Sequence, residues 1–182
     1  MNDASAAAAF TRDASIHPEG VYVGSRAMVR VISPWHGITH GLNSASLRYF
    51  NAAGASFDGR IGEDRTYSFN PISLAMKAVL LDEYEFKVFG ADYETPDGTC
   101  IRYYTHVEDL ADAHVKAICH LGNSCETTAV NLGTGTGSSM VDVINATAAV
   151  AQEPVAHEIV ARRAGDLVST YANPNYALKT LG

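Results

Sequence analysis

Apolar residues recur every three or four positions in several stretches of the chain, a spacing that predicts amphipathic helices. The predicted helices cover residues 24–32, 70–82, 107–121, 140–151 and 173–178. Pro34 is expected to end the first helix, because proline removes a backbone hydrogen bond and clashes with the preceding turn. Asn70 before Pro71 gives the second helix a capping side chain and a first-turn residue whose missing N–H does no harm.

Short apolar runs separate these helices and predict strands at residues 44–50, 86–89, 101–105, 129–132 and 158–162. Helices and strands therefore alternate along the chain, which predicts an α/β layered protein. The first strand is followed by Asn51-Ala52-Ala53-Gly54, whose small side chains would let the backbone approach a ligand closely. Gly133-Thr134-Gly135-Thr136-Gly137 lies between a strand and a helix, but its spacing is GxGxG rather than GxGxxG. We therefore interpret it as a tight turn and not as a cofactor site.

Composition narrows the class of protein. The chain has 182 residues, of which 47% are hydrophobic and 18% charged, enough to bury a core in a single domain. We expect residues 1–9, which are small and low in complexity, to form a disordered tail and residues 10–182 to fold. The formal net charge of -7 argues against general binding to nucleic acids or anionic membranes. The three cysteines form neither a CxxC pair nor a zinc pattern, which predicts reduced thiols in a cytoplasmic protein and no metal site.

Two groups of charged residues are candidates for chemistry. Tyr22 and Arg26 are four residues apart at the start of a predicted helix, so their side chains share a face and the cation can lower the tyrosine pKa. Arg102, inside a strand, and the run from Arg162 to Asp166 can clamp a diphosphate through bidentate hydrogen bonds. Surface packing is the alternative for the first group, and solvated loop charge is the alternative for the second.

Three blocks of sequence resemble UDP-glucose 4-epimerases, which are extended short-chain dehydrogenases/reductases. The blocks are Leu47 to Ala55, Phe89 to Arg102 and His106 to His114, and Asn131 to Gly135 and Arg162 to Asp166 fit the family in the same order. The resemblance runs from about Phe10 to the last residue.

This resemblance implies a fold and a pair of ligands. The fold is the carboxy-terminal part of an NAD(P)-binding, Rossmann-like α/β protein together with its substrate-binding subdomain. We expect the amino-terminal Rossmann half, with the family's GxxGxxG turn, to be missing, so that residues 10–182 form a truncated catalytic and substrate-binding region. NAD is the implied cofactor of the intact enzyme, and a UDP-hexose is the implied substrate.

The resemblance also implies roles for individual residues. Tyr22 stands at the catalytic tyrosine, which takes the proton of the sugar 4-hydroxyl while the hydride passes to the nicotinamide. Arg26 stands where the family's YxxxK pattern has lysine, and Tyr103 stands where the family has aspartate. The implied catalytic residues are Tyr22 and Arg26, and the implied cofactor-binding residues are Tyr22, Arg26 and Tyr49. The implied substrate-binding residues are Asn51 for the UDP-sugar, Arg102 and Arg163 for the diphosphate, and Asp166 for the uridine ribose.

Two functional hypotheses follow. The first is an epimerase-type polypeptide of galactose metabolism, whose intact form interconverts UDP-glucose and UDP-galactose through a 4-keto intermediate. We expect this chain alone to be inactive, because it cannot enclose the cofactor. The alternative is a non-catalytic remnant that binds UDP-sugars or a partner surface, motivated by the missing half and by Arg26. Exposed strand edges further predict a homodimer or self-association.

Overall fold

The structure, a computed structural model, describes residues 21–64, 68–81, 84–124, 126–170 and 173–182; the side chains of residues 21–23 and 26 lie outside the description. The tail predicted at residues 1–9 also falls outside it. In chain order the elements are α1 (Val21–His40), β1 (Ala45–Arg48), β2 (Asn51–Ala53), α2 (Pro71–Leu80), β3 (Phe86–Phe89), β4 (Ile101–Arg102), β5 (Tyr104–His106), α3 (Val107–Ser124), β6 (Thr128–Asn131), β7 (Ser138–Ser139), α4 (Met140–Ala151), β8 (His157–Val160) and α5 (Asn175–Leu181). The predicted alternation of helices and strands is confirmed.

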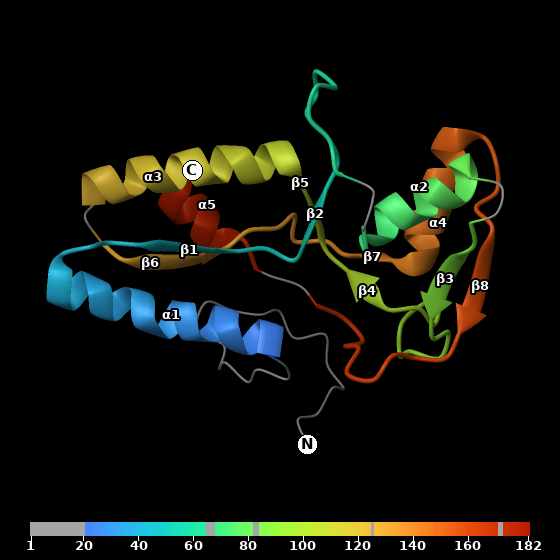
Figure 1. Cartoon of the computed structure of the whole chain (residues 1–182), viewed down its shortest axis with the longest axis horizontal. Coiled ribbons are helices and arrows are strands. Elements are labelled where there is room, and N and C mark those ends of the chain that lie inside the picture. Colours follow the sequence, from blue (N-terminus) through green and yellow to red (C-terminus); the bar gives the residue numbers. More distant parts are fainter. Residues whose placement is uncertain (1–20, 65–67, 82–83, 125, 171–172) are drawn as a thin grey trace.

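The described strands pair two by two. β1 runs parallel to β6, β2 parallel to β5 and β3 parallel to β8, while β4 and β7 are antiparallel. In Figure 1, α3 and α5 lie on one side of the β1–β6 pair and α1 lies on the other. The helices α2 and α4 accompany β3 and β8 at the opposite end of the molecule (Figure 1). The molecule is therefore an α/β protein with two packed regions.

Each region has its own apolar core. The larger core joins α2, β3 and α4, and its buried residues are Ala75, Ala78, Phe86, Val88, Tyr93, Cys100, Met140, Val143, Ile144 and Val155. The smaller core joins α3, β6 and α5 and consists of Leu110, Val130, Leu132 and Ala177. β2, β5 and β4 connect the two regions, so a ligand bound at their ends would contact both.

The caps of α2 and α4 fix where these helices begin. The Asn70 side chain accepts a hydrogen bond from the Ile72 N–H (3.1 Å) and donates one to the Ala52 carbonyl (2.6 Å), which ties the start of α2 to β2. At α4, Ser139 and Asp142 form a capping box in which each side chain bonds the backbone N–H of the other. Both predicted helix starts are confirmed.

The first predicted helix is longer than expected. α1 continues through Pro34 to His40, so the prediction that Pro34 ends the helix is wrong. A proline removes a single backbone hydrogen bond, and the regular pattern resumes beyond it, as the bond from the Gly41 N–H to the Gly37 carbonyl shows (3.0 Å). The Ser33 and Thr39 hydroxyls also bond the carbonyls four residues before them.

Three predicted strands differ from the structure by more than a one-residue shift. The strand expected over residues 44–50 ends at Arg48, and Asn51–Ala53 forms a second strand because the chain changes its partner from β6 to β5. The strand expected over residues 101–105 is divided at Tyr103, which separates β4 from β5. The strand expected over residues 158–162 ends at Val160, where its partner β3 ends. Arg162 therefore lies in a loop and not in the sheet.

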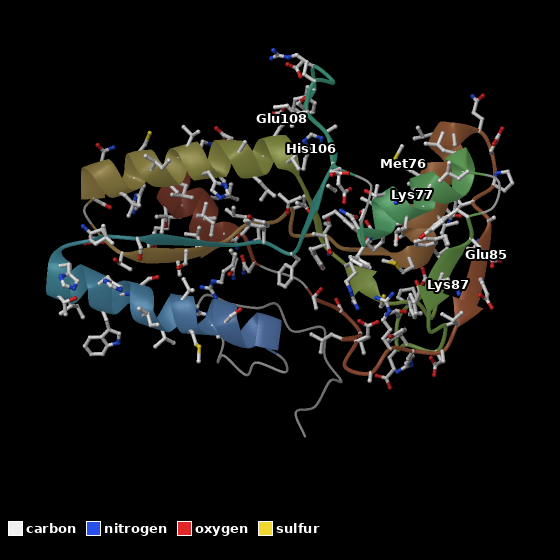
Figure 2. All side chains as sticks on the ribbon, in the orientation of Figure 1. Met76, Lys77, Glu85, Lys87, His106 and Glu108 are labelled. Carbon is white, nitrogen blue, oxygen red and sulfur yellow. The ribbon has the colours of Figure 1, made fainter. Side chains whose placement is uncertain are left out.

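The segment that directly follows β2 rises away from the body of the protein (Figure 1). Its Phe57 N–H donates to the Glu108 carboxylate (3.0 Å), and the Phe57 ring stacks on His106 with the ring centroids 4.8 Å apart. His106 in turn accepts a hydrogen bond from the Glu108 N–H (3.2 Å), so it acts as a cap of α3. Figure 2 shows His106 and Glu108 at the start of α3, below this segment.

Candidate functional site

Asn51 is held at the junction of the two regions. Its backbone N–H and its side-chain Nδ2 both donate to the Tyr103 carbonyl, at 3.2 and 3.0 Å. β2 pairs with β5 in register, with Asn51 opposite Tyr104. The side chain is half-buried and fixed beside the residue that follows Arg102. The structure thus brings two of the predicted substrate-binding residues close together in space.

Arg102 also forms an ion pair with Asp166, a third predicted substrate-binding residue, across 64 positions of sequence. Arg102 Nη2 lies 3.4 Å from Asp166 Oδ1, and its Nη1 donates to the Leu167 carbonyl at 2.8 Å. The guanidinium is mostly buried, with 15% of the side chain exposed. The Ile101 N–H also donates to the Val168 carbonyl (2.9 Å), so the segment with Asp166 runs alongside β4. A cation fixed in this way presents its remaining surface in a defined direction.

Arg163 lies on an aromatic ring close to the same segment. Its guanidinium carbon is 3.5 Å from the centroid of the Phe89 ring, at the end of β3. The Asp166 N–H donates to the Arg163 carbonyl (3.3 Å), and Gly165 takes a positive φ of 82° between them. This turn keeps Arg163 and Asp166 on one short loop. We call residues 161–168, which contain Arg162, Arg163 and Asp166, the arginine loop.

The residue before Arg163 faces a different partner. Arg162 Nε donates to Asp92 Oδ1 (2.6 Å), Nη2 donates to the Asp92 carbonyl, and the guanidinium carbon lies 4.0 Å from the centroid of the Tyr93 ring. Sequence reasoning gave no separate role to Arg162, Asp92 or Tyr93. The available signal was Gly90, a glycine that directly follows a strand and precedes Asp92 and Tyr93, which is typical of a close approach of the backbone to another group.

The candidate catalytic residues lie in α1. Tyr22 and Arg26 are on the first two turns of the helix, but their side chains fall outside the described part of the structure. Tyr49, a predicted cofactor-binding residue, directly follows β1, is 38% exposed and makes an edge contact with His114 (6.1 Å between ring centroids). It therefore lies at the carboxyl end of a parallel strand, where ligands of α/β proteins bind.

The Tyr103 ring packs against Gly137, where the lack of a side chain leaves room for it. A Cβ atom at Gly137 would lie 2.5 Å from Tyr103 Cε2 and 2.5 Å from Ile101 Cγ2, both closer than real contacts allow. The last glycine of the Gly133–Gly137 turn is thus needed for close packing, which agrees with its interpretation as a turn. It also explains how the chain accommodates a buried tyrosine at the position where the resemblance implies aspartate.

Burial and hydrogen bonding shift four pKa values in this region. Burial raises the pKa of the Tyr104 hydroxyl, of Tyr93 and of the Cys100 thiol. For Asp97, burial acts to raise the pKa, but hydrogen bonds from Ser139 and Thr99 outweigh it and leave the pKa below its usual value. The Asp97 carboxylate therefore stabilises the connection between β4 and the start of α4.

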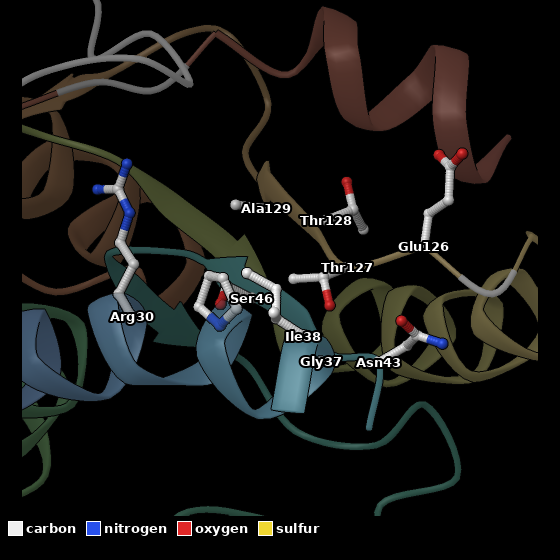
Figure 3. A pocket seen from close by; sticks show the side chains of 10 residues that line it. Arg30, Gly37, Ile38, Asn43, Ser46, Glu126, Thr127, Thr128 and Ala129 are labelled. Atoms are coloured by element: carbon white, nitrogen blue, oxygen red, sulfur yellow. The ribbon is translucent and has the colours of Figure 1, made fainter. Parts of the chain in front are cut away.

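A cavity between α1 and the β1–β6 pair involves other residues than those of this site. It measures about 570 Å³ and lies between α1 and the segments that begin β1 and β6, with Arg30, Asn43, Ser46 and Thr128 among its lining residues (Figure 3). None of the predicted site residues lines it. It opens at the amino ends of the parallel strands, opposite the end at which such sheets bind ligands. We therefore place the candidate site at Asn51, Arg102 and the arginine loop.

The described residues contain no group of three or more His, Cys, Asp or Glu side chains placed to share a metal ion. Within the same residues, no helix is both long and apolar enough to cross a lipid bilayer.

Comparison with known proteins decides the family. The profile of the NAD dependent epimerase/dehydratase family matches residues 3–133. The chain belongs to this family. It is 48% identical over 147 residues to the UDP-glucose 4-epimerase of Rhizobium meliloti (strain 1021), covering 81% of this chain and 45% of the relative. It is 43% identical over 141 residues to the UDP-glucose 4-epimerase of Bos taurus, covering 77% of this chain and 40% of the relative.

Solved structures of epimerases share the fold. The UDP-glucose 4-epimerase of Brucella ovis, in complex with NAD, superposes with a TM-score of 0.84 at 40% identity over 91% of this chain and 51% of that chain. The enzyme of Stenotrophomonas maltophila, with bound NAD and formylated UDP-arabinopyranose, gives a TM-score of 0.89 at 34% identity over 95% of this chain and 52% of that chain. The fold is therefore that of an extended short-chain dehydrogenase/reductase, and the chain spans about half the length of the relatives it matches.

Proposed function

We propose that this chain is the UDP-hexose-binding part of a UDP-glucose 4-epimerase, which in its intact form interconverts UDP-glucose and UDP-galactose. The observation that carries the proposal is the ion pair between Arg102 and Asp166, which are 64 positions apart in the sequence, with Arg163 on the same short loop as Asp166. Two arginines and a carboxylate in one region of the protein suit a ligand that has both a diphosphate and a ribose. The identity to curated epimerases supports this substrate class.

Different residues of the chain would bind the substrate and transfer the proton. Arg102 and Arg163 would bind the two phosphates, Asp166 would accept hydrogen bonds from the ribose hydroxyls, and Asn51 would contact the sugar. Tyr22 would take the proton of the sugar 4-hydroxyl and return it to the inverted centre, with the positive charge of Arg26 four residues further along α1. An arginine differs from the usual lysine in reach and geometry, so we expect proton transfer to be slower.

Tyr49 allows a test of whether NAD fits the described residues. Its ring is partly exposed at the carboxyl end of β1, where a planar nicotinamide could pack against it. We therefore assign Tyr49 to the cofactor, together with Tyr22 and Arg26. When bound, NAD would accept the hydride of the sugar and give it back. We propose that the chain alone does not turn over, because NAD also needs the rest of the dinucleotide-binding fold.

A fusion protein tests this proposal. Residues 10–182 are joined to the amino-terminal half of the Rhizobium meliloti relative, and the conversion of UDP-galactose to UDP-glucose is followed in a coupled assay. We expect the fusion to be active, the isolated chain to be inactive, and the Tyr22→Phe fusion to serve as the inactive control. A folded, NAD-loaded fusion that binds UDP but shows no turnover, even after Arg26→Lys, would favour the second candidate, a non-catalytic UDP-sugar-binding remnant.

We also propose that the chain self-associates through α1. The helix exposes a row of large apolar side chains: Met28, Val29, Val31, Ile32, Trp35 and Ile38. An apolar patch of this kind on a water-soluble domain is typical of a protein–protein contact. The helix face, more than the strand edges, is the surface on which we expect a homodimer to form.

A further inference from the structure

Arg162 makes more contacts than a solvated loop arginine does. Two of its three nitrogens donate to Asp92, one to the carboxylate at 2.6 Å and one to the backbone carbonyl, and the face of the guanidinium covers Tyr93. An exposed arginine–aspartate pair alone contributes little to stability. Here a cation–π contact and a bond to a fixed backbone oxygen add to the pair, and together they define the orientation of the side chain.

The backbone next to this contact has a glycine, Gly90, which leaves room for the Arg162 and Tyr93 side chains. Gly90 has a φ of 85°, and a Cβ atom there would lie 2.6 Å from Arg162 Cγ and 2.7 Å from Tyr93 Cε2. The Gly90 N–H also donates to the Val160 carbonyl (2.8 Å), which joins the end of β3 to the end of β8. Tyr93 itself is 4% exposed and belongs to the larger core. Arg162 is therefore fastened to a rigid part of the protein.

The fastened residue directly precedes the proposed ligand-binding residues. Arg163 stacks on Phe89, the turn from Arg163 to Asp166 is closed by a backbone hydrogen bond, and Asp166 pairs with Arg102. The arginine loop is thus attached at one end through Arg162 and at the other through Asp166. If the first attachment is lost, Arg163 can leave Phe89 while Asp166 keeps its ion pair.

We propose that Arg162 is a positioning residue, which through Asp92 and Tyr93 holds Arg163 where it binds the diphosphate of a nucleotide sugar. This inference rests on the proposed function. Arg162 acts on the ligand through Arg163, because its Nε, its Nη2 and one face of its guanidinium are directed to Asp92 and Tyr93.

A double-mutant cycle with UDP tests this role. The dissociation constant of UDP is measured by calorimetric titration of the 182-residue chain and of its Arg162→Ala, Arg163→Ala and doubly substituted variants. We expect Arg162→Ala to weaken binding by roughly tenfold, the effect of about one charge-assisted hydrogen bond, and to have no further effect once Arg163 is alanine. An equal loss in both backgrounds would mean that Arg162 acts independently of Arg163 and would overturn the proposal.

The chain offers a matched control. Arg60 pairs with Asp58 at the same Nε–Oδ distance of 2.6 Å, but in the segment after β2, away from the arginine loop. Arg60→Ala should leave UDP binding unchanged, and a comparable loss there would show that the effect of Arg162→Ala reflects net charge alone.

A second measurement needs no ligand. The Nε–Hε signal of Arg163 in an NMR spectrum should carry a ring-current shift from Phe89, and this shift should disappear in Arg162→Ala and persist in Arg60→Ala. An unchanged Arg163 signal in Arg162→Ala would overturn the positioning role. If the unsubstituted chain does not bind UDP, the proposed function fails, while this spectrum still decides whether Arg162 positions Arg163.

Discussion

The substitution Gly90→Ala tests the packing that supports the arginine loop. An alanine at a φ of 85° costs about 1–2 kcal/mol of backbone strain, of which 0.4–1 kcal/mol is regained because the unfolded chain loses freedom. The new Cβ would also overlap Arg162 Cγ and Tyr93 Cε2, and overpacking of this kind costs about 1–3 kcal/mol. We therefore expect Gly90→Ala to lower the free energy of unfolding by roughly 1–5 kcal/mol.

Gly165→Ala is the matched control for this substitution. Gly165 has nearly the same φ, 82°, but a Cβ atom there has no described neighbour within 4 Å. Its cost should be backbone strain alone, about 1 kcal/mol. Both variants are unfolded with urea and followed by far-UV circular dichroism. If the two variants lose equal stability, the overlap with Arg162 and Tyr93 does not occur, and the reasoning about the loop is refuted.

Three further predictions concern other parts of the chain. The pKa of Asp97 is lowered in the folded protein, so its carboxylate stabilises the fold at pH values above the unfolded pKa of 3.8. The difference in stability between the unsubstituted chain and Asp97→Asn, measured by urea titration, should therefore shrink as the pH falls through the lowered pKa. A difference that does not depend on pH would contradict this. Cys119 is exposed whereas Cys100 is buried with a raised pKa, so iodoacetamide should modify Cys119 first by peptide mass mapping; faster modification of Cys100 would disagree. Trp35→Glu should shift the chain toward monomer in light-scattering chromatography, while Val150→Glu, on an even more exposed apolar residue of α4, should not; the same shift in both would count against α1 as the contact.

Local signals in the sequence predicted the regular elements well. The Asn70–Pro71 pair and the serines before Met140 marked the starts of α2 and α4, because capping chemistry is decided within a few residues. The breaks between β1 and β2 and between β4 and β5 could not be predicted in this way, because they come from a change of pairing partner far along the chain. The continuation of α1 past Pro34 shows that a single missing hydrogen bond does not decide where a long helix ends.

The candidate site could be predicted only as separate residues. The resemblance pointed to Arg102, Arg163 and Asp166, and the structure brings Arg102 and Asp166 into contact. The role of Arg162 was missed, since its predicted place in a strand concealed the contact with Asp92 across 70 positions of sequence. Because β8 ends at Val160, two residues before the predicted end, Arg162 lies in a loop and its side chain can reach Tyr93. Such a contact depends on tertiary packing, which no local pattern encodes.

Calorimetric titration of the purified chain with UDP-glucose tests the central claim most directly. The chain, confirmed to be folded by circular dichroism, is titrated at low and moderate salt beside its Arg163→Ala variant. We expect binding of UDP-glucose without NAD, weakened by salt because the contacts are ionic, and weaker again in Arg163→Ala, where Arg102 alone is left to bind the diphosphate. A folded chain that gives no binding heat at either salt concentration, or an Arg163→Ala variant that binds as well as the unsubstituted chain, would contradict the proposed UDP-hexose site.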